Sequence, residues 1–179
     1  MKFEDLIRIY TIPRYKYKKE RLVQELMSRK DWMSVQNDGQ RISRTNYYLV
    51  SSAAPYSNPT PSETEVSITR DFFEDYNSHL ATNDITKGQI LQTTPSWYQV
   101  YEKGDYHGYH RHPGSNYSCV LFVNLPDPSG ATEFIISGNK YTPIVKEGQI
   151  ITFPSALTHR SPLWELEEKK IIISWNMNL

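Results

Sequence analysis

Residues 97–112 constrain this chain most, because they place three of the five histidines of a 179-residue sequence within six positions. His110 and His112 are two residues apart, so on a β-strand their side chains would point to one face, about 7 Å apart. Two imidazoles placed in this way can bind one divalent metal ion at about 2.1 Å. A third ligand must come from elsewhere in the fold, and His159 is the obvious candidate. The pattern predicts a mononuclear metal enzyme.

Composition limits the partners that such a protein could have. The 20 basic and 20 acidic residues cancel, so a polyanionic partner such as nucleic acid is not favoured. The apolar runs are far shorter than the roughly 20 residues that span a bilayer, and the N-terminus lacks the apolar core of a secretion signal. A single cysteine, Cys119, excludes an intramolecular disulfide. We therefore expect a cytoplasmic protein without a membrane partner.

The first part of the chain predicts short elements of both kinds. Residues 6–12 alternate loosely before Pro13 and predict a strand. Residues 17–28 repeat apolar positions at helical spacing and predict an amphipathic helix. Residues 46–51 predict another strand. The proline-rich residues 51–61 predict a loop, which is either a surface connection or a flap over a pocket.

A second helix is predicted to begin after Ser62, since Glu65 three residues later completes a capping box. His79 near its end is interpreted as a surface residue or a favourable charge at the helix C-terminus. The helix is expected to bury one apolar stripe, made of Val66, Thr69, Phe73, Tyr76 and Leu80.

The second half of the chain predicts an all-β core. Turn sequences at 127–130 and 137–140 separate short apolar runs. We expect a mainly β fold with flanking helices, a sandwich or jelly roll. The length fits a single domain, 1–179, in which residues 1–87 pack as a lead-in on a metal-binding core of residues 88–179. The predicted strands lie near 89–93, 96–102, 117–125, 131–136, 141–146, 149–153 and 170–176.

Four pieces of this half carry a resemblance to a known family: residues 97–112, 118–126, 146–159 and 170–176. In this order and spacing they resemble the iron(II)/2-oxoglutarate-dependent oxygenases, specifically the small prolyl-hydroxylase-like branch often seen in bacteria and phages. The resemblance covers about residues 96–176, less than half of the chain.

The resemblance implies a double-stranded β-helix that holds iron(II) and uses 2-oxoglutarate and O2 as co-substrates. It implies hydroxylation of a small-molecule or peptide substrate, with peptidyl proline as one candidate. By position, the metal ligands and catalytic centre would be His110, His112 and His159, and the residues that hold 2-oxoglutarate would be Lys170, Tyr101 and Ser174.

Lys170 also has a physical case of its own. On a strand it shares a face with Ser174, and an inward ammonium is costly without an anion, so it calls for a ligand carboxylate. Two alternatives stay open: Lys170 could be an exposed lysine at the start of the strand, or a shift by one residue could turn Lys169 inward.

The chain departs from the family pattern at three positions. His112 replaces the usual carboxylate ligand, which would leave the site one unit more positive. Phe122 stands where a tyrosine is frequent, and Lys170 where arginine is more common.

Other residues near the motif have less defined places. His107 has the opposite strand parity to His110 and is expected to support a ligand or lie at the surface. Outside candidates for a missing carboxylate ligand are Asp105, Asp127 and Glu133.

Two other functions fit parts of the pattern. A cupin-type metal enzyme shares Gly-x5-His-x-His, but it has no need of Lys170 and would turn over without 2-oxoglutarate. A non-catalytic β-sandwich used for binding or assembly would hold no stoichiometric metal.

Overall fold

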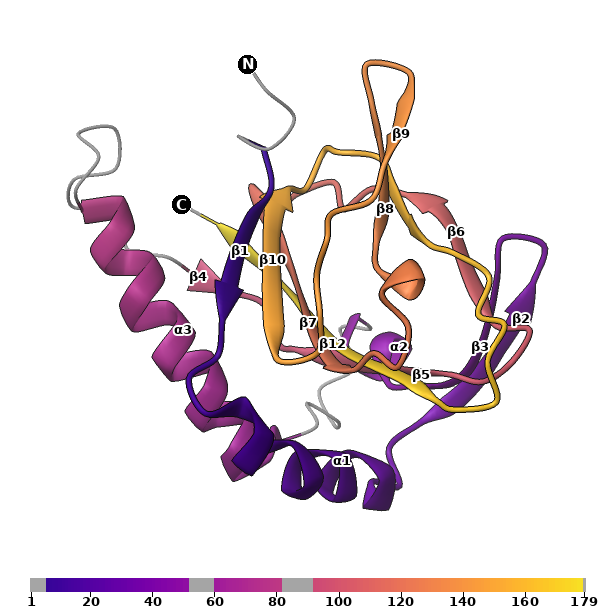
Figure 1. The fold of residues 1–179 in the computed structure, drawn as a ribbon, viewed down its shortest axis with the longest axis horizontal. Coiled ribbons are helices and arrows are strands. Elements are labelled where there is room, and N and C mark those ends of the chain that lie inside the picture. Colours follow the sequence, from indigo (N-terminus) through magenta and orange to yellow (C-terminus); the bar gives the residue numbers. More distant parts are fainter. Residues whose placement is uncertain (1–5, 52–59, 82–91, 179) are drawn as a thin grey trace.

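The computed structural model describes residues 6–51, 60–81 and 92–178, and a curled antiparallel sheet dominates it (Figure 1). The helices are α1 (Lys19–Ser28), α2 (Tyr47–Ser51) and α3 (Glu63–Ala81), with short 3-10 turns η2 (Tyr15–Tyr17) and η4 (Pro128–Gly130). The strands are β1 (Arg8–Thr11), β2 (Met33–Asn37), β3 (Gln40–Thr45), β4 (Gln92–Thr93), β5 (Trp97–Tyr101), β6 (Tyr106–His110), β7 (Tyr117–Asn124), β8 (Glu133–Ile136), β9 (Asn139–Tyr141), β10 (Gln149–Pro154), β11 (His159–Ser161) and β12 (Lys170–Asn178).

Neighbouring strands follow the order β1, β10, β7, β12, β5, β3, β6, β11, β8, β9, while β2 pairs with β3 and β4 with β12. The sheet curls until β6, β11 and β8 lie across from β7, β12 and β5, which gives the ring of strands seen in Figure 1. One buried apolar cluster fills the interior, and a second lies between the outer face of the sheet and the helices. The predicted mainly β jelly roll with flanking helices is confirmed.

Strand parity on β12 separates these two clusters. Ile171, Ile173 and Trp175 belong to the outer cluster, whereas Ile172 belongs to the inner one. This alternation is the period of two that a strand buried on both faces imposes. The face of β12 that carries Ile172 is therefore the face that lines the interior.

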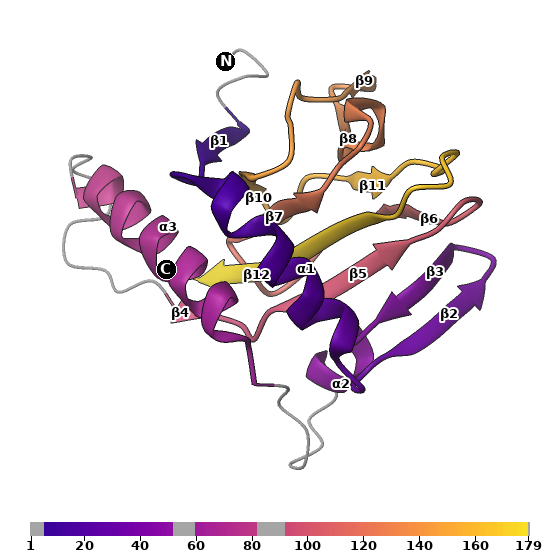
Figure 2. The ribbon, with the colours of Figure 1, turned by 60° about the horizontal axis from the view of Figure 1, so that its bottom comes forward.

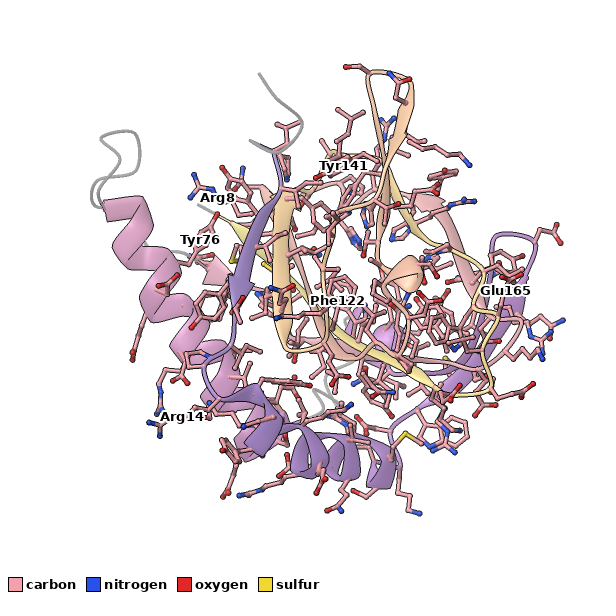
Figure 3. The ribbon with its side chains drawn as sticks, in the orientation of Figure 1. Arg8, Arg14, Tyr76, Phe122, Tyr141 and Glu165 are labelled. Atoms are coloured by element: carbon pink, nitrogen blue, oxygen red, sulfur yellow. The ribbon has the colours of Figure 1, made fainter. Side chains whose placement is uncertain are left out.

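Helices α1 and α3 cover the outer face of the sheet (Figure 2). The N-cap prediction for α3 is confirmed, because the Glu65 backbone N–H donates to Ser62 Oγ at 3.1 Å. Figure 3 shows Tyr76 on the side of α3 that faces β1, and Phe122 in the middle of the fold.

The predicted apolar stripe of α3 is rotated relative to the observed one. Ile68, Phe72 and Tyr76 are the buried apolar residues, while Val66 is 47% exposed. Thr69 and Phe73 are only half-buried. The side chains of Leu80 and His79 lie outside the described residues. The contacts with β1 and β12 select the 68/72/76 line, in which Phe72 packs 5.6 Å from the Trp175 ring.

Two predicted strands are wrong. Residues 46–51 form the short helix α2, since the Tyr47 ring packs against Trp97 at 5.2 Å and the Tyr47 N–H donates to Thr45 Oγ1 at 3.1 Å. Tertiary packing overrides the β preference of this aromatic segment. Residues 141–146 lie mostly past the end of β9, because Pro143 has no N–H for a ladder.

Four strands were missing from the prediction: β2, β3, β6 and β11. Strand β3 lies between β5 and β6, so the lead-in contributes to the wall of the ring. The predicted turn at 137–140 is confirmed at Ser137 and Gly138, which both have positive φ and join β8 to β9, whereas residues 139–140 already belong to β9. The proline-rich loop falls largely, and the strand at 89–93 partly, outside the described residues.

Gly148→Ala is expected to destabilise the fold by roughly 2–5 kcal/mol, because two costs add at this position. Gly148 has a φ of 77°, and a Cβ there would lie 2.4 Å from the Tyr15 ring. Tyr15 cannot easily move, since its hydroxyl donates to the Val123 carbonyl at 2.6 Å. Gly138→Ala is the control: its φ is 78° and nothing lies within 4 Å of its Cβ. Chemical denaturation of both variants measures the difference, and equal losses would contradict the packing argument.

Among the described residues, no helix is both long and apolar enough to cross a membrane.

Candidate metal centre and co-substrate pocket

Two neighbouring strands of the sheet bring the predicted ligands together. Strand β11 is antiparallel to β6, and His159 lies directly opposite His110. His112 follows just after β6, where its N–H donates to the Ser155 carbonyl at 3.1 Å. One ligand atom from each of the three histidines lies within 4.8 Å of the others. Ligands at about 2.1 Å from one ion lie at most about 4.2 Å apart, so a small closure around an ion completes the site.

Hydrogen bonds orient two of the three rings. His110 Nδ1 lies 2.8 Å from the Gly108 carbonyl, and His159 Nδ1 lies 2.8 Å from the Leu157 carbonyl. A bond to a carbonyl requires the proton on Nδ1, so Nε2 keeps its lone pair for a metal. The same kind of support is typical of metal-binding histidines, where it fixes the tautomer and the ring orientation.

Burial keeps all three imidazoles neutral. Loss of solvent lowers the pKa of His159 to about 3 and that of His112 to about 4, and the pKa of His110 is also lowered by burial. The mutual repulsion of the imidazolium forms of these rings adds to the effect at His159 and His112. At neutral pH the donor set is therefore deprotonated and ready to bind a cation.

His107 lies next to the triad without joining it. Its ring stacks on His110 with centroids 3.9 Å apart and planes at 13°. Burial lowers the pKa of His107 to about 3, so it stacks as a neutral ring. The structure thus places His107 against His110 and not at the exposed surface.

The three carboxylates considered as extra ligands are engaged elsewhere. Asp105 accepts two backbone N–H groups and is buried. Asp127 caps η4, and Glu133 forms an ion pair with Arg160 at 2.8 Å. Among the described residues, the group close enough to share one ion consists of the three histidines alone.

A cavity of about 200 Å³ opens beside the triad. Its walls include Tyr101 from β5 and Ser174 from β12, two residues predicted to hold 2-oxoglutarate. Ile172 and Asn176 share the cavity face of β12 with Ser174, as the parity of the strand requires.

Lys170 is buried behind this cavity, with 1% of its surface exposed. Its Nζ lies 4.7 Å from the centroid of the Tyr101 ring, donates to Ser161 Oγ at 2.7 Å, and donates to the Gly130 carbonyl. No carboxylate pairs with it in the part of the chain that the structure describes. Burial accordingly lowers the pKa of Lys170 to about 7. The inward position of Lys170 excludes the alternative in which it is an exposed lysine.

Lys169 points the other way and pairs with Glu102 near the surface. The register that would have turned Lys169 inward is therefore excluded, since Lys170 lies opposite Tyr101 in the β12–β5 ladder.

The other two predicted co-substrate residues lie at different depths. Tyr101 is fully buried, and its hydroxyl lies beside Ser161 without a hydrogen bond of normal geometry. Ser174 is four residues from Lys170, about 13 Å along a strand, so it lines a different part of the cavity. Ser161, which the sequence analysis missed, is the hydroxyl that contacts Lys170. Its spacing from His159, two residues along one strand, could have indicated it.

Residues 95–142 match the model of a family described as putative 2OG-Fe(II) oxygenase. No curated protein sequence matches the chain.

Solved structures similar to the whole chain come from several organisms. A Pseudomonas putida prolyl-4-hydroxylase aligns with a TM-score of 0.66 and 10% identity, over 97% of this chain and 92% of its own. A Trichoplax adhaerens prolyl hydroxylase in complex with a hypoxia-inducible-factor peptide aligns with a TM-score of 0.65 and 11% identity, over 96% of this chain and 83% of its own. HygX from Streptomyces hygroscopicus, with nickel, 2-oxoglutarate and hygromycin B bound, aligns with a TM-score of 0.64 and 11% identity, over 98% of this chain and 84% of its own. At these identities the likeness establishes the shared fold.

The donor set fits the cofactors of these enzymes. Three neutral imidazoles could hold iron(II), and a buried ammonium without an anion among the described residues lies behind the adjoining cavity. Residues 95–142 are similar to a family of putative 2OG-Fe(II) oxygenases, and the chain shares the fold of solved prolyl hydroxylases and 2OG-Fe(II) oxygenases.

Proposed function

We propose that this protein is an iron(II)- and 2-oxoglutarate-dependent hydroxylase in which His110, His112 and His159 hold the metal. Lys170 would hold the far carboxylate of 2-oxoglutarate, and the Tyr101 hydroxyl would complete that end of the pocket. The observation that carries the proposal is the Lys170 ammonium, which is buried without an anion close behind a cavity that borders the triad. Such a group is costly to bury unless a ligand supplies the missing charge.

With 2-oxoglutarate and O2, the bound iron supplies the oxidising power, so that 2-oxoglutarate becomes succinate and CO2 while one oxygen atom enters a substrate C–H bond. The chain's part is to bind, to orient and to exclude water. Phe153 packs 4.7 Å from the His159 ring and Phe134 packs 6.0 Å from it, so one flank of the triad is apolar. The carbonyls of Gly108 and Leu157 hold the ring protons away from the metal side.

Two classes of substrate fit the proposal. One structural neighbour binds a peptide and another binds hygromycin B, a small molecule. A prolyl or other peptidyl residue and a small molecule are therefore both candidate substrates. Because β1 and β3 belong to the same sheet as the site, we treat residues 1–179 as one catalytic domain.

The proposal is tested by incubating iron-loaded protein with 2-oxoglutarate in the presence and absence of O2 and measuring succinate. O2-dependent succinate, absent without iron, supports the oxygenase. Consumption of O2 that does not depend on 2-oxoglutarate would instead indicate cupin-type chemistry, for which Lys170 has no role. A protein that takes up no metal would indicate the non-catalytic alternative.

The affinity for 2-oxoglutarate is expected to fall as the pH rises above about 7, because only the ammonium form of Lys170 pairs with a carboxylate. The pKa of Lys170 in the free protein is about 7, and a bound carboxylate raises it. Binding above pH 7 therefore takes up a proton, and the dissociation constant is expected to increase about tenfold per pH unit. Calorimetric titration in buffers of different ionisation enthalpy measures both the proton uptake on binding and the dissociation constant for 2-oxoglutarate. Lys170→Arg should bind without this dependence, because a guanidinium stays protonated over this pH range. A wild-type affinity that is flat from pH 7 to 9 would contradict the assignment.

A further inference from the structure

The charged side chains that line the cavity beside the triad are positive. Among the described residues that line it, none is acidic, and the fixed charges are Arg111 and Arg160. Three neutral imidazoles leave the two positive charges of a bound iron uncompensated by the protein. The two carboxylates of 2-oxoglutarate balance the two charges of the iron, so the ammonium of Lys170 and the guanidinium of Arg111 remain as positive charges. The loaded site therefore still favours a further anion.

Arg111 is the group that can meet such an anion. It lies between His110 and His112 in the sequence, and its Nε donates to Thr158 Oγ1 at 2.7 Å. This bond holds the guanidinium at the rim of the cavity, and neither Nη group bonds to a residue that the structure describes. Arg111 forms no ion pair with any residue that the structure describes. Arg160 differs, because Glu133 lies 2.8 Å from its Nε and compensates its charge.

An aromatic wall borders the same opening. It consists of Tyr47, Tyr48 and Trp97, all of which line the cavity. The Tyr47 ring packs 5.2 Å from Trp97 and 5.3 Å from Tyr48, and Trp97 in turn lies 5.7 Å from the His112 ring. Such a surface binds the apolar or cyclic part of a ligand. The wall and the free guanidinium thus offer two different contacts around one metal centre.

We propose that the substrate is a carboxylic acid whose carboxylate pairs with Arg111 while its cyclic or apolar part lies against this aromatic wall. The inference rests on the proposed function, because it assigns the substrate class of the same site. A planar guanidinium with two free Nη groups matches a carboxylate in a bidentate way that a neutral amide cannot reproduce.

The test uses anaerobic protein loaded with iron(II) and 2-oxoglutarate and two matched pairs of probes: phenylacetate with phenylacetamide, and N-acetylproline with its primary amide. Dissociation constants come from the perturbation of the visible iron–2-oxoglutarate band. In the wild type, at least one acid is expected to bind about tenfold or more tightly than its amide. In Arg111→Gln this preference should disappear, while the band itself and the affinity for 2-oxoglutarate are retained.

Arg70→Gln is the matched control, because Arg70 lies exposed on α3, away from the cavity. It should keep the preference for acids, and Arg111→Lys should keep part of it. Equal binding of acids and amides by the wild type, no binding of any probe, or an unchanged preference in Arg111→Gln would each overturn the inference. Absence of the visible band in the wild type would instead contradict the proposed function and, with it, the inference.

Discussion

His159→Ala is expected to lower the affinity for iron(II) by at least about 100-fold and to abolish O2-dependent succinate formation. Loss of a hydrogen bond that merely supports a ligand already costs about 10–100-fold in metal affinity, so loss of a ligand should cost more. His159 is the ligand that β11 places opposite His110, and the Leu157 carbonyl orients it. Iron affinity is measured by anaerobic equilibrium dialysis, and circular dichroism verifies that the variant is folded.

His107→Ala is the matched control for this variant. His107 has the same chemistry, is also partly buried, and stacks on His110, yet it is not one of the three clustered ligands. It should keep iron affinity within about tenfold of the wild type, as expected for a supporting contact. Equal losses in the two variants, or iron binding that persists in His159→Ala, would show that the triad is not the metal site.

Lys170→Met is expected to raise the dissociation constant for 2-oxoglutarate about 100-fold or more, with iron binding unchanged. Removing one partner of a buried ion pair costs about 3–5 kcal/mol, because the other charge is left without compensation. In the protein without 2-oxoglutarate, the same substitution is not expected to lower the thermal stability. Its Lys170 ammonium has no anion among the described residues, so methionine is expected to leave the Tm unchanged or to raise it.

Lys169→Met provides the comparison for Lys170→Met. Lys169 is the neighbouring lysine, but it is partly exposed and pairs with Glu102, so its loss should cost at most about 1 kcal/mol and leave 2-oxoglutarate binding unaffected. A Lys170→Met protein that unfolds, or that binds 2-oxoglutarate as the wild type does, would show that Lys170 has a structural role only.

Those parts of the site that follow from strand parity and from the motif could be predicted. The β12 alternation placed Lys170 inward and Ile171 outward. The motif placed His110 and His112 at one centre, although His112 lies just past the end of β6 and not on the strand that the parity argument assumed. The distant His159 was also identified, because the resemblance supplied the order of the motifs. These predictions depend on local geometry, which the sequence encodes directly.

Features that depend on tertiary contacts could not be predicted. Residues 46–51 have β-forming side chains but form α2, because Tyr47 packs on Trp97. Strand β6 contains Gly108 and two histidines, which carry no strand signal, and only its pairing with β3 and β11 makes it a strand. Likewise Ser161 and the stacked His107 belong to the site through cross-strand neighbours rather than through any motif.

The rotation of the buried stripe on α3 has a similar origin. Val66 fits the helical period as well as Ile68 does, and only the position of the sheet decides that Ile68 is buried and Val66 exposed. The Glu65 carboxylate, buried beside Ser96, lies on the same inward side of the helix. A polar residue on an inward face cannot be recognised from apolar periodicity alone.

The measurement that tests the account most directly is the binding of 2-oxoglutarate to anaerobic protein with and without iron(II), followed in the visible spectrum. The account predicts a weak metal-to-ligand charge-transfer band that requires both components. This band should disappear in His159→Ala and weaken strongly in Lys170→Met. Iron that binds without any such band, or a protein that binds no iron at all, would contradict the assignment of this centre as a 2-oxoglutarate-dependent oxygenase site.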